Sequence, residues 1–211
     1  FRHKLNTDPQ DDVLVFEETD PRYFVGVGRT RSGKFIVIGT GMNDEDEVLV
    51  IPADAPETSP RVIEPRAEGI EYSVEHQGDR FLIVTNADDA KDFKIVEAPV
   101  SAPGRENWKD VVPHKPGRTI VGLDAYRDWI IWLERENALP RICYVHSAEG
   151  AKAEVQAIAF EEEAYSLGML GSYEFATDTL RFTYSSMTTP GRVYDYDMAK
   201  RTRVLRTEDE V

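Results

Sequence analysis

The residues of this chain that could do chemistry are few and far apart in the sequence. Ser185 and Ser186 offer adjacent hydroxyl groups, but no histidine or other base lies nearby in the sequence to activate a nucleophile. The Thr188-Thr189-Pro190 pattern that follows is typical of a turn, so a structural role is favoured for both serines. A Gly-x-Ser-x-Gly nucleophile elbow occurs nowhere in the 211 residues. The sequence therefore predicts no catalytic residue.

Metal ligands do not occur at a useful spacing. The four histidines, His3, His76, His114 and His146, each lack a second histidine or cysteine at ligand spacing. The acidic run 43–47 lacks the Asp-x-Asn-x-Asp-Gly spacing and the distal glutamate of a calcium loop, so it is predicted to be a hairpin tip. His76 is expected to form hydrogen bonds at the end of a strand. The sequence predicts neither a metal nor another cofactor.

The elements that would position these residues are predicted to be strands. Four segments repeat one layout of four strand-like runs, and corresponding first strands begin about 47 residues apart, which is in the range of four-stranded propeller blades. The second runs are almost continuously apolar, as expected where both faces of a sheet are covered. Turn-forming residues separate the first and second runs of each segment: Ser32-Gly33, Gln77-Gly78-Asp79, Arg127-Asp128 and Thr177-Asp178.

These repeats predict an all-β fold, a single partial β-propeller domain over residues 1–211. The predicted blades are residues 21–66, 67–116, 117–162 and 163–211, after a remnant of a preceding blade at 1–20. Closed propellers usually have about four to eight blades, and the remnant favours an interrupted larger ring over a closed ring of four. We therefore expect about four four-stranded antiparallel blades that form an open arc.

Composition favours a folded and strongly acidic domain. The chain is 41% hydrophobic and 10% aromatic, which is enough for a core. No run of about 18 uncharged apolar residues is present, so no membrane-spanning helix is expected. The formal net charge of −14 excludes a nucleic-acid-binding protein, since phosphate contacts need clustered Lys and Arg. The single cysteine, Cys143, lies in a strand-like run and favours a reducing, cytoplasmic location.

One stretch of the sequence resembles a known family. Residues 181–198 read RFTYSSMTTPGRVYDYDM, which resembles the "YSS-x-TTP-x-x-VYDYD" segment that ends the β-propeller domain of the prolyl oligopeptidase family of serine peptidases. Residues 3–18 and 71–94 are similar to passages of the oligopeptidase B (protease II) branch of that family, in one register over nearly the whole chain. Asn6 replaces the customary glycine, and residues 208–211 stand where "QEV" is usual. Neither position carries chemistry.

The resemblance implies a seven-bladed propeller that caps an α/β-hydrolase domain of the same parent chain. In that family the propeller restricts access, so that only short peptides reach the active site. The oligopeptidase B branch cleaves after Arg or Lys, and carboxylates of the hydrolase domain supply most of that preference. The catalytic triad would lie beyond Val211, so the present chain is expected to be a non-catalytic part of an oligopeptidase.

The resemblance also directs attention to blade ends and blade faces. Arg66, Glu71 and Tyr72 stand in family-like contexts near blade ends and are expected to face the hydrolase domain or the central channel. A group of four blades should also expose apolar faces at both ends of the arc and self-associate through them. The residues expected there are Phe35, Val37, Val48 and Val50 in the first blade, and Leu180, Phe182, Tyr184 and Tyr194 in the last.

Two other functions remain open. A free-standing propeller could act as a protein-interaction scaffold, although the Gly-His and Trp-Asp punctuation of WD repeats is missing. A propeller hydrolase such as a glycosidase or lactonase would need carboxylates at the channel, and Glu71 and Asp124 are acidic residues of predicted first strands.

Overall fold

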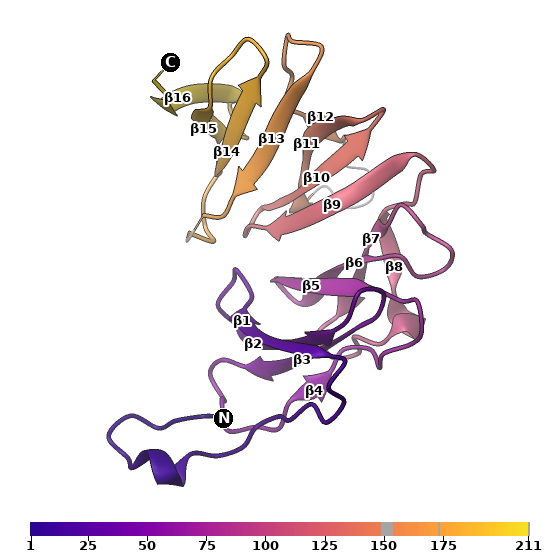
Figure 1. Cartoon of the computed structure of the whole chain (residues 1–211), viewed down its shortest axis with the longest axis vertical. Coiled ribbons are helices and arrows are strands. Elements are labelled where there is room, and N and C mark those ends of the chain that lie inside the picture. Colours follow the sequence, from indigo (N-terminus) through magenta and orange to yellow (C-terminus); the bar gives the residue numbers. More distant parts are fainter. Residues whose placement is uncertain (149–153, 173, 211) are drawn as a thin grey trace.

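The computed structural model describes residues 1–148, 154–172 and 174–210, and almost all of its regular structure is β-strand. Four antiparallel sheets follow one another along the chain, and each contains four strands that are consecutive in sequence. The sheets lie along an open arc with the first and last sheets at its two ends (Figure 1). The expected all-β fold of four four-stranded blades is confirmed.

Each blade has the same strand order as the chain. The first blade holds β1 (Phe24–Arg29), β2 (Phe35–Gly41), β3 (Asp46–Pro52) and β4 (Arg61–Val62). The second holds β5 (Tyr72–Gln77), β6 (Arg80–Thr85), β7 (Lys94–Pro99) and β8 (Lys109–Val112). The third holds β9 (Arg118–Ala125), β10 (Trp129–Glu136), β11 (Leu139–His146) and β12 (Gln156–Ala157). The fourth holds β13 (Tyr165–Leu170), β14 (Thr179–Ser186), β15 (Arg192–Asp197) and β16 (Thr202–Glu208).

The helices that the structure describes are two short 3-10 turns, η1 (Pro9–Asp11) and η2 (Arg105–Asn107). Within the described ranges, no helix has the length and apolar character needed to cross a bilayer.

Successive side chains along a strand point to opposite faces of the sheet and therefore pack in different inter-blade cores. Trp129 and Trp132, both on β10, are three residues apart and therefore lie on opposite faces of the sheet. Trp132 is buried between the second and third blades, and Trp129 lies between the third and fourth blades. Cys143, opposite Trp132 on β11, is buried in the same core as Trp132. The predicted use of both tryptophans in blade packing is confirmed.

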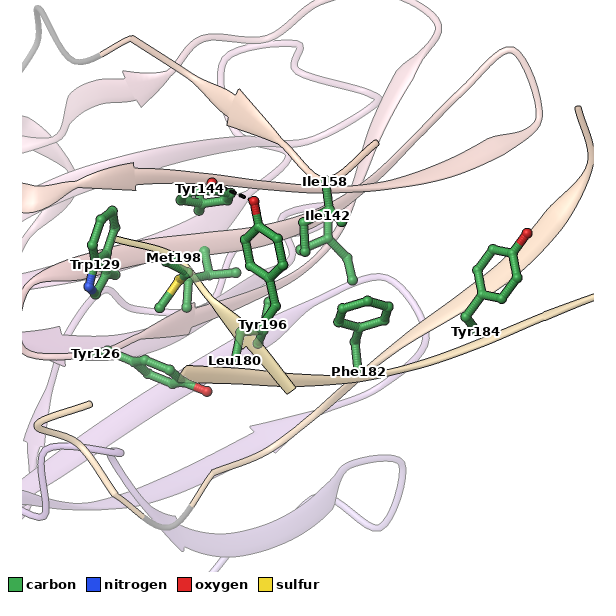
Figure 2. Packing of buried hydrophobic residues seen from close by; sticks show 11 residues of the cluster. Tyr126, Trp129, Ile142, Tyr144, Ile158, Leu180, Phe182, Tyr184, Tyr196 and Met198 are labelled. Atoms are coloured by element: carbon green, nitrogen blue, oxygen red, sulfur yellow. Dashed lines mark hydrogen bonds between the residues drawn. The ribbon is translucent and has the colours of Figure 1, made fainter. Parts of the chain in front are cut away.

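The core between the third and fourth blades, called the third core below, contains most of the aromatic packing shown in Figure 2. Phe182 and Leu180 of β14 are fully buried there. The hydroxyl groups of Tyr144 and Tyr196 are 3.0 Å apart and form a hydrogen bond between β11 and β15. This bond satisfies two polar groups that would otherwise be buried without partners. Tyr126 lies at the edge of the same core.

The residues predicted to be exposed at the ends of the arc lie on the wrong faces. Phe35, Val48 and Val50 are buried against the second blade, and Leu180, Phe182 and Tyr184 are buried against the third. Val37 and Tyr194 are partly buried against the same two cores. The prediction failed because one residue step along a strand moves a side chain to the other face, and the sequence does not say which face meets the next blade.

Other apolar side chains are exposed at the two ends. In β1, Phe24 and Val27 are 82% and 78% exposed, and in β16 the side chains of Val204 and Leu205 are about half exposed.

Residues 1–20 cover part of the first blade. Arg2 and Val13 form an isolated bridge, and η1 lies between them in the sequence. Val15 and Phe16 pack against Ile38 and its neighbours in the first sheet. The N-terminal segment therefore shields apolar surface on the side of the first sheet that faces away from the second blade.

Candidate functional site

The four connections between first and second strands are joined to one another at one end of the blades. We call this end the hairpin face; it consists of residues 30–34, 78–79, 126–128, 171–172 and 174–178. Hydrogen bonds link each blade to the next there. These links are Ser32 Oγ to His76 Nδ1 at 2.8 Å, the Gln77 amide nitrogen to the Tyr126 carbonyl at 2.6 Å, and the Arg127 N–H to the Phe175 carbonyl at 2.9 Å.

A second set of contacts crosses the arc rather than following it. Arg31 lies in the β1–β2 hairpin, where Gly33 adopts a φ of 67° and donates its N–H to the Thr30 carbonyl. This tight turn directs the Arg31 side chain out of the first blade. Its guanidinium donates from Nη2 to Asp124 of the third blade and from Nη1 to the carbonyl of Ser172 of the fourth blade.

The second blade completes this arrangement, which we call the axial cluster (Arg31, Glu75, Asp124, Tyr126 and Ser172). The Arg31 backbone N–H donates to Glu75 Oε2 at 3.0 Å. The Arg31 guanidinium carbon lies 5.1 Å from the centre of the Tyr126 ring, within cation–π distance. A single residue of the first blade thus contacts all three other blades.

Burial determines the electrostatics of the axial cluster. The Arg31 and Asp124 side chains are only 13% and 14% exposed. Burial raises the pKa of the Glu75 carboxyl, and the Arg31 N–H bond opposes that rise. Burial, followed by the Asp124 charge, raises the pKa of Tyr126 to about 12. Within the described residues, the Tyr126 hydroxyl and Arg31 Nε are buried without a hydrogen-bond partner.

A cleft opens beside the guanidinium. It has a volume of about 390 Å³ and lies between the first, second and fourth blades. The residues that line it are Arg29, Thr30, Arg31, Glu75, Gly171 and Ser172. The cluster is therefore a charged site with access from solvent.

His76 fulfils the expected strand-end role, and its partner was not predicted. Ser32 and His76 are 44 residues apart in the sequence, yet the hairpin of the first blade brings Ser32 to the His76 ring. Burial lowers the pKa of His76 and thereby favours the neutral ring. In the described part of the chain no hydrogen bond joins this ring to a carboxylate. The pair therefore links two blades and lacks the orienting acid of a triad.

The residues predicted at blade ends, Arg66, Glu71 and Tyr72, lie at or before the start of β5, whereas the hairpin face lies at its end. Arg66 pairs with Glu18 and stacks over Tyr23, with 4.0 Å from its guanidinium carbon to the ring centre. It thereby holds the N-terminal segment onto the first blade. Whether it also faces another domain stays a prediction.

Tyr72 joins the first two blades, whereas Glu71 is bonded within the second blade. The Tyr72 hydroxyl accepts from the Val48 N–H at 2.8 Å and donates to the Glu64 carbonyl at 2.5 Å. The Glu71 N–H donates to the Asn86 side-chain oxygen at 2.9 Å, and burial raises the pKa of the Glu71 carboxyl. The three predicted residues thus make structural contacts with different partners, and none of them belongs to the axial cluster.

The family-like segment 181–198 is organised around Glu162. Its carboxylate accepts hydrogen bonds from the hydroxyls of Tyr184 at 2.6 Å, Thr189 at 2.6 Å and Thr188 at 3.1 Å. Hydroxyl donors, with Ser186 the strongest, lower the pKa of Glu162 to about 2. Ser186 Oγ also accepts the backbone N–H groups of Thr188 and Thr189, which confirms its use in a turn.

Comparison with known proteins supports one family. The family model described as "Prolyl oligopeptidase, N-terminal beta-propeller domain" matches residues 1–209. The chain is 39% identical over 193 residues to dipeptidyl aminopeptidase BI of Pseudoxanthomonas mexicana, which covers 92% of this chain and 26% of that protein. It is 29% identical over 198 residues to protease 2 of Moraxella lacunata, covering 94% of this chain and 28% of the relative.

Solved structures of oligopeptidase B share the fold. The closed form from Trypanosoma brucei with covalently bound antipain matches with a TM-score of 0.92 and 25% identity, over 99% of this chain and 30% of that one. The enzyme from Leishmania major matches with the same TM-score and 22% identity, again over 99% of this chain. The chain spans about a quarter to a third of the length of the relatives it matches.

Proposed function

Because the chain belongs to the N-terminal β-propeller domain family of prolyl oligopeptidases, we propose that it is the non-catalytic, substrate-gating part of a serine oligopeptidase. The observation that carries this proposal is the match over residues 1–209 together with the TM-score of 0.92 to oligopeptidase B. The chain supplies the four blades, and no residue in it is assigned to the chemistry.

The partner that we propose for the propeller is the hydrolase domain of the same parent chain. The relatives support this, since the matched region is only 30% of the oligopeptidase B chain. Arg66, Glu71 and Tyr72, at the end of the blades away from the hairpin face, are the proposed interdomain or channel-facing residues.

Short basic peptides, cleaved after Arg or Lys, are the proposed substrates. The likeness to oligopeptidase B supports this specificity, and the net charge of −14 would attract cationic peptides toward the propeller. Such steering weakens with salt, because charges are screened beyond about 8 Å at physiological ionic strength.

A second candidate follows from the 39% identity to dipeptidyl aminopeptidase BI. On this alternative, the parent enzyme would release dipeptides from a free N-terminus. Fluorogenic peptides ending in Arg, with and without an acetylated N-terminus, distinguish the two activities. An endopeptidase cleaves both peptides, and a dipeptidyl aminopeptidase requires the free amine.

Two further proposals concern the chain itself. Exposed apolar side chains at the ends of the arc, such as Val25 and Val27 of β1, support self-association of the 211-residue chain. Sedimentation velocity would detect it, and a Val25→Ser/Val27→Ser variant should sediment as a smaller species. The free, buried Cys143 supports a reducing, cytoplasmic location, which fractionation of the source cells would test.

The gating proposal is tested with the full-length gene product and a series of Arg-containing fluorogenic peptides of increasing length. Gating predicts that kcat/KM falls steeply above a limiting length and that removal of the propeller flattens this dependence. Electrostatic steering predicts that kcat/KM for cationic peptides also falls with salt. A length profile that is unchanged without the propeller would contradict gating, and a salt-independent kcat/KM would contradict steering alone.

A further inference from the structure

The Arg31 side chain is bound by groups of other blades in the way that a separate ligand would be bound. Its guanidinium leaves the first blade and enters a site built by other blades, with the Asp124 carboxylate on one side, the Ser172 carbonyl on another and the Tyr126 ring against its face. A carboxylate, a carbonyl oxygen and an aromatic face are the three groups that recognise a planar guanidinium. These groups come from β9, the third hairpin and the loop after β13.

The bound guanidinium is not fully satisfied. A guanidinium has five N–H donors in a planar fork, and Arg31 Nε is buried without a partner in the described part of the chain. The Tyr126 hydroxyl beside it is also unpartnered although the residue is fully buried. A buried cation that leaves donors unused is held less tightly than a fully bonded one. This occupant can therefore be exchanged for another.

A route for exchange is present. The cleft of about 390 Å³ borders the Arg31 side chain and is lined by Glu75 and Ser172, so a second cation has space to approach. Arg31 is carried by a short hairpin, residues 30–34, and is not a member of the inter-blade cores.

We propose that Asp124, Tyr126 and the Ser172 carbonyl form a guanidinium-binding site, which Arg31 occupies as an internal ligand and which an arginyl side chain of a peptide can occupy in its place. While Arg31 is bound, it clasps the first blade to the third and fourth blades. An arriving arginyl group releases this clasp and is itself held at the hairpin face. The choice of a basic peptide as external ligand rests on the proposed function; the guanidinium site itself rests on the geometry.

The site is tested on the 211-residue chain with n-propylguanidinium, which carries the tip of an arginine side chain and no peptide. Calorimetric titration of Arg31→Ala should show binding at least about tenfold tighter than that of the wild type, in which the ligand must displace Arg31. Asp124→Asn in the Arg31→Ala background should abolish the gain. Arg29→Ala is the matched control, because it removes a cation from the rim of the same cleft and should create no binding site.

n-Butylammonium is the control ligand for recognition of shape, because it carries the same charge without the planar fork of N–H donors. It should bind Arg31→Ala more weakly than n-propylguanidinium. Equal binding of n-propylguanidinium by the wild type and Arg31→Ala, or binding that survives Asp124→Asn, would overturn the proposal.

A second measurement avoids dependence on a foldable Arg31 variant. Spin labels at Lys34→Cys and Glu174→Cys, in a Cys143→Ser background, report the separation of the first and fourth hairpins. Saturating n-propylguanidinium should lengthen this distance, and n-butylammonium should lengthen it less. An unchanged distance at saturation would overturn the clasp.

The failure of this inference is distinguishable from failure of the proposed function. If the full-length enzyme does not cleave after Arg or Lys but Arg31→Ala binds n-propylguanidinium through Asp124, the specificity is wrong and the site stands. If the enzyme cleaves after Arg but the variant binds nothing, the site is wrong and the specificity stands.

Discussion

The third core and the axial cluster share Tyr126, yet the two regions use opposite chemistry. On the core side, the residue packs beside Trp129, Leu180 and Met198, which are apolar and nearly fully buried. On the axial side, the same ring faces the Arg31 guanidinium, and its hydroxyl has no partner among the described residues. The core joins only neighbouring blades, whereas the cluster also joins blades that are not neighbours.

This difference in chemistry indicates that the core stabilises the arc, whereas the axial cluster can bind and release a ligand. Complete burial of an aromatic or aliphatic side chain contributes about 1.5–3 kcal/mol relative to exposure, and the contacts of the core have no competitor in water. A buried ion pair roughly balances its attraction against the loss of hydration. We therefore assign the stability of the arc to the inter-blade cores and reversible recognition to the axial cluster.

The largest expected effect is the loss of a core side chain. Phe182→Ala removes a fully buried ring from the third core and should lower the free energy of unfolding by about 3–5 kcal/mol, since the cavity cannot collapse. Met187→Ala, on the next loop and 95% exposed, is the control and should stay within about 0.5 kcal/mol of the wild type. Urea denaturation measures both. Similar losses for the two variants would contradict the assignment of stability to the core.

A smaller effect is expected from a single polar link between blades. Tyr72→Phe removes the hydroxyl that bonds Val48 and Glu64, and should cost about 1–3 kcal/mol because the buried Val48 N–H and the half-buried Glu64 carbonyl lose a partner. Hydrogen exchange should accelerate at the Val48 amide. Tyr165→Phe is the control, as no hydrogen bond joins the Tyr165 hydroxyl to the described residues. A Tyr72→Phe variant as stable as the control would show that the Tyr72 hydroxyl contributes nothing to holding the first two blades together.

The smallest effect is a pH dependence at the rim of the fourth blade. The pKa of Glu162 is lowered from 4.5 to about 2 by hydroxyl donors, so its contribution to stability is present above pH 4.5 and is lost as pH falls toward 2. The urea midpoint of the wild type should therefore fall more between pH 5 and pH 2 than that of Glu162→Gln. Glu161→Gln, at the adjacent position, should behave like the wild type. Identical pH profiles for all three proteins would show that the hydroxyl groups bonded to Glu162 contribute nothing to stability.

Most of the fold could be predicted from the sequence because it depends on local patterns. Alternating strands such as 181–184 and turn formers such as Ser32-Gly33 recur at the period of a blade, and the structure has the four sheets they predict. The face of each strand that packs against the neighbouring blade could not be predicted. Phe35 and Val50 were assigned to an exposed end and are buried, because the alternation defines two faces without identifying the neighbour of either.

The axial cluster could hardly be predicted from the sequence. Its members are separated by up to about 140 residues, and no spacing rule joins them, since the arc alone brings the hairpins together. The sequence indicated Asp124 only as an acidic residue of a predicted first strand. The available signal was positional: Arg31, Glu75 and Asp124 all lie within a few residues of a first-to-second-strand turn, so an alignment of the four blades would have grouped them.

We propose that stability lies in the cores, recognition in the axial cluster and the peptidase chemistry outside these 211 residues. The most direct test compares the 211-residue chain with the full-length gene product, using a fluorogenic Arg-containing peptide and a fluorophosphonate probe for activated serines. We predict that the full-length protein hydrolyses the peptide and is labelled, and that the chain alone does neither. Hydrolysis by the purified chain, or labelling of it that Ser32→Ala abolishes, would contradict the assignment of a non-catalytic propeller.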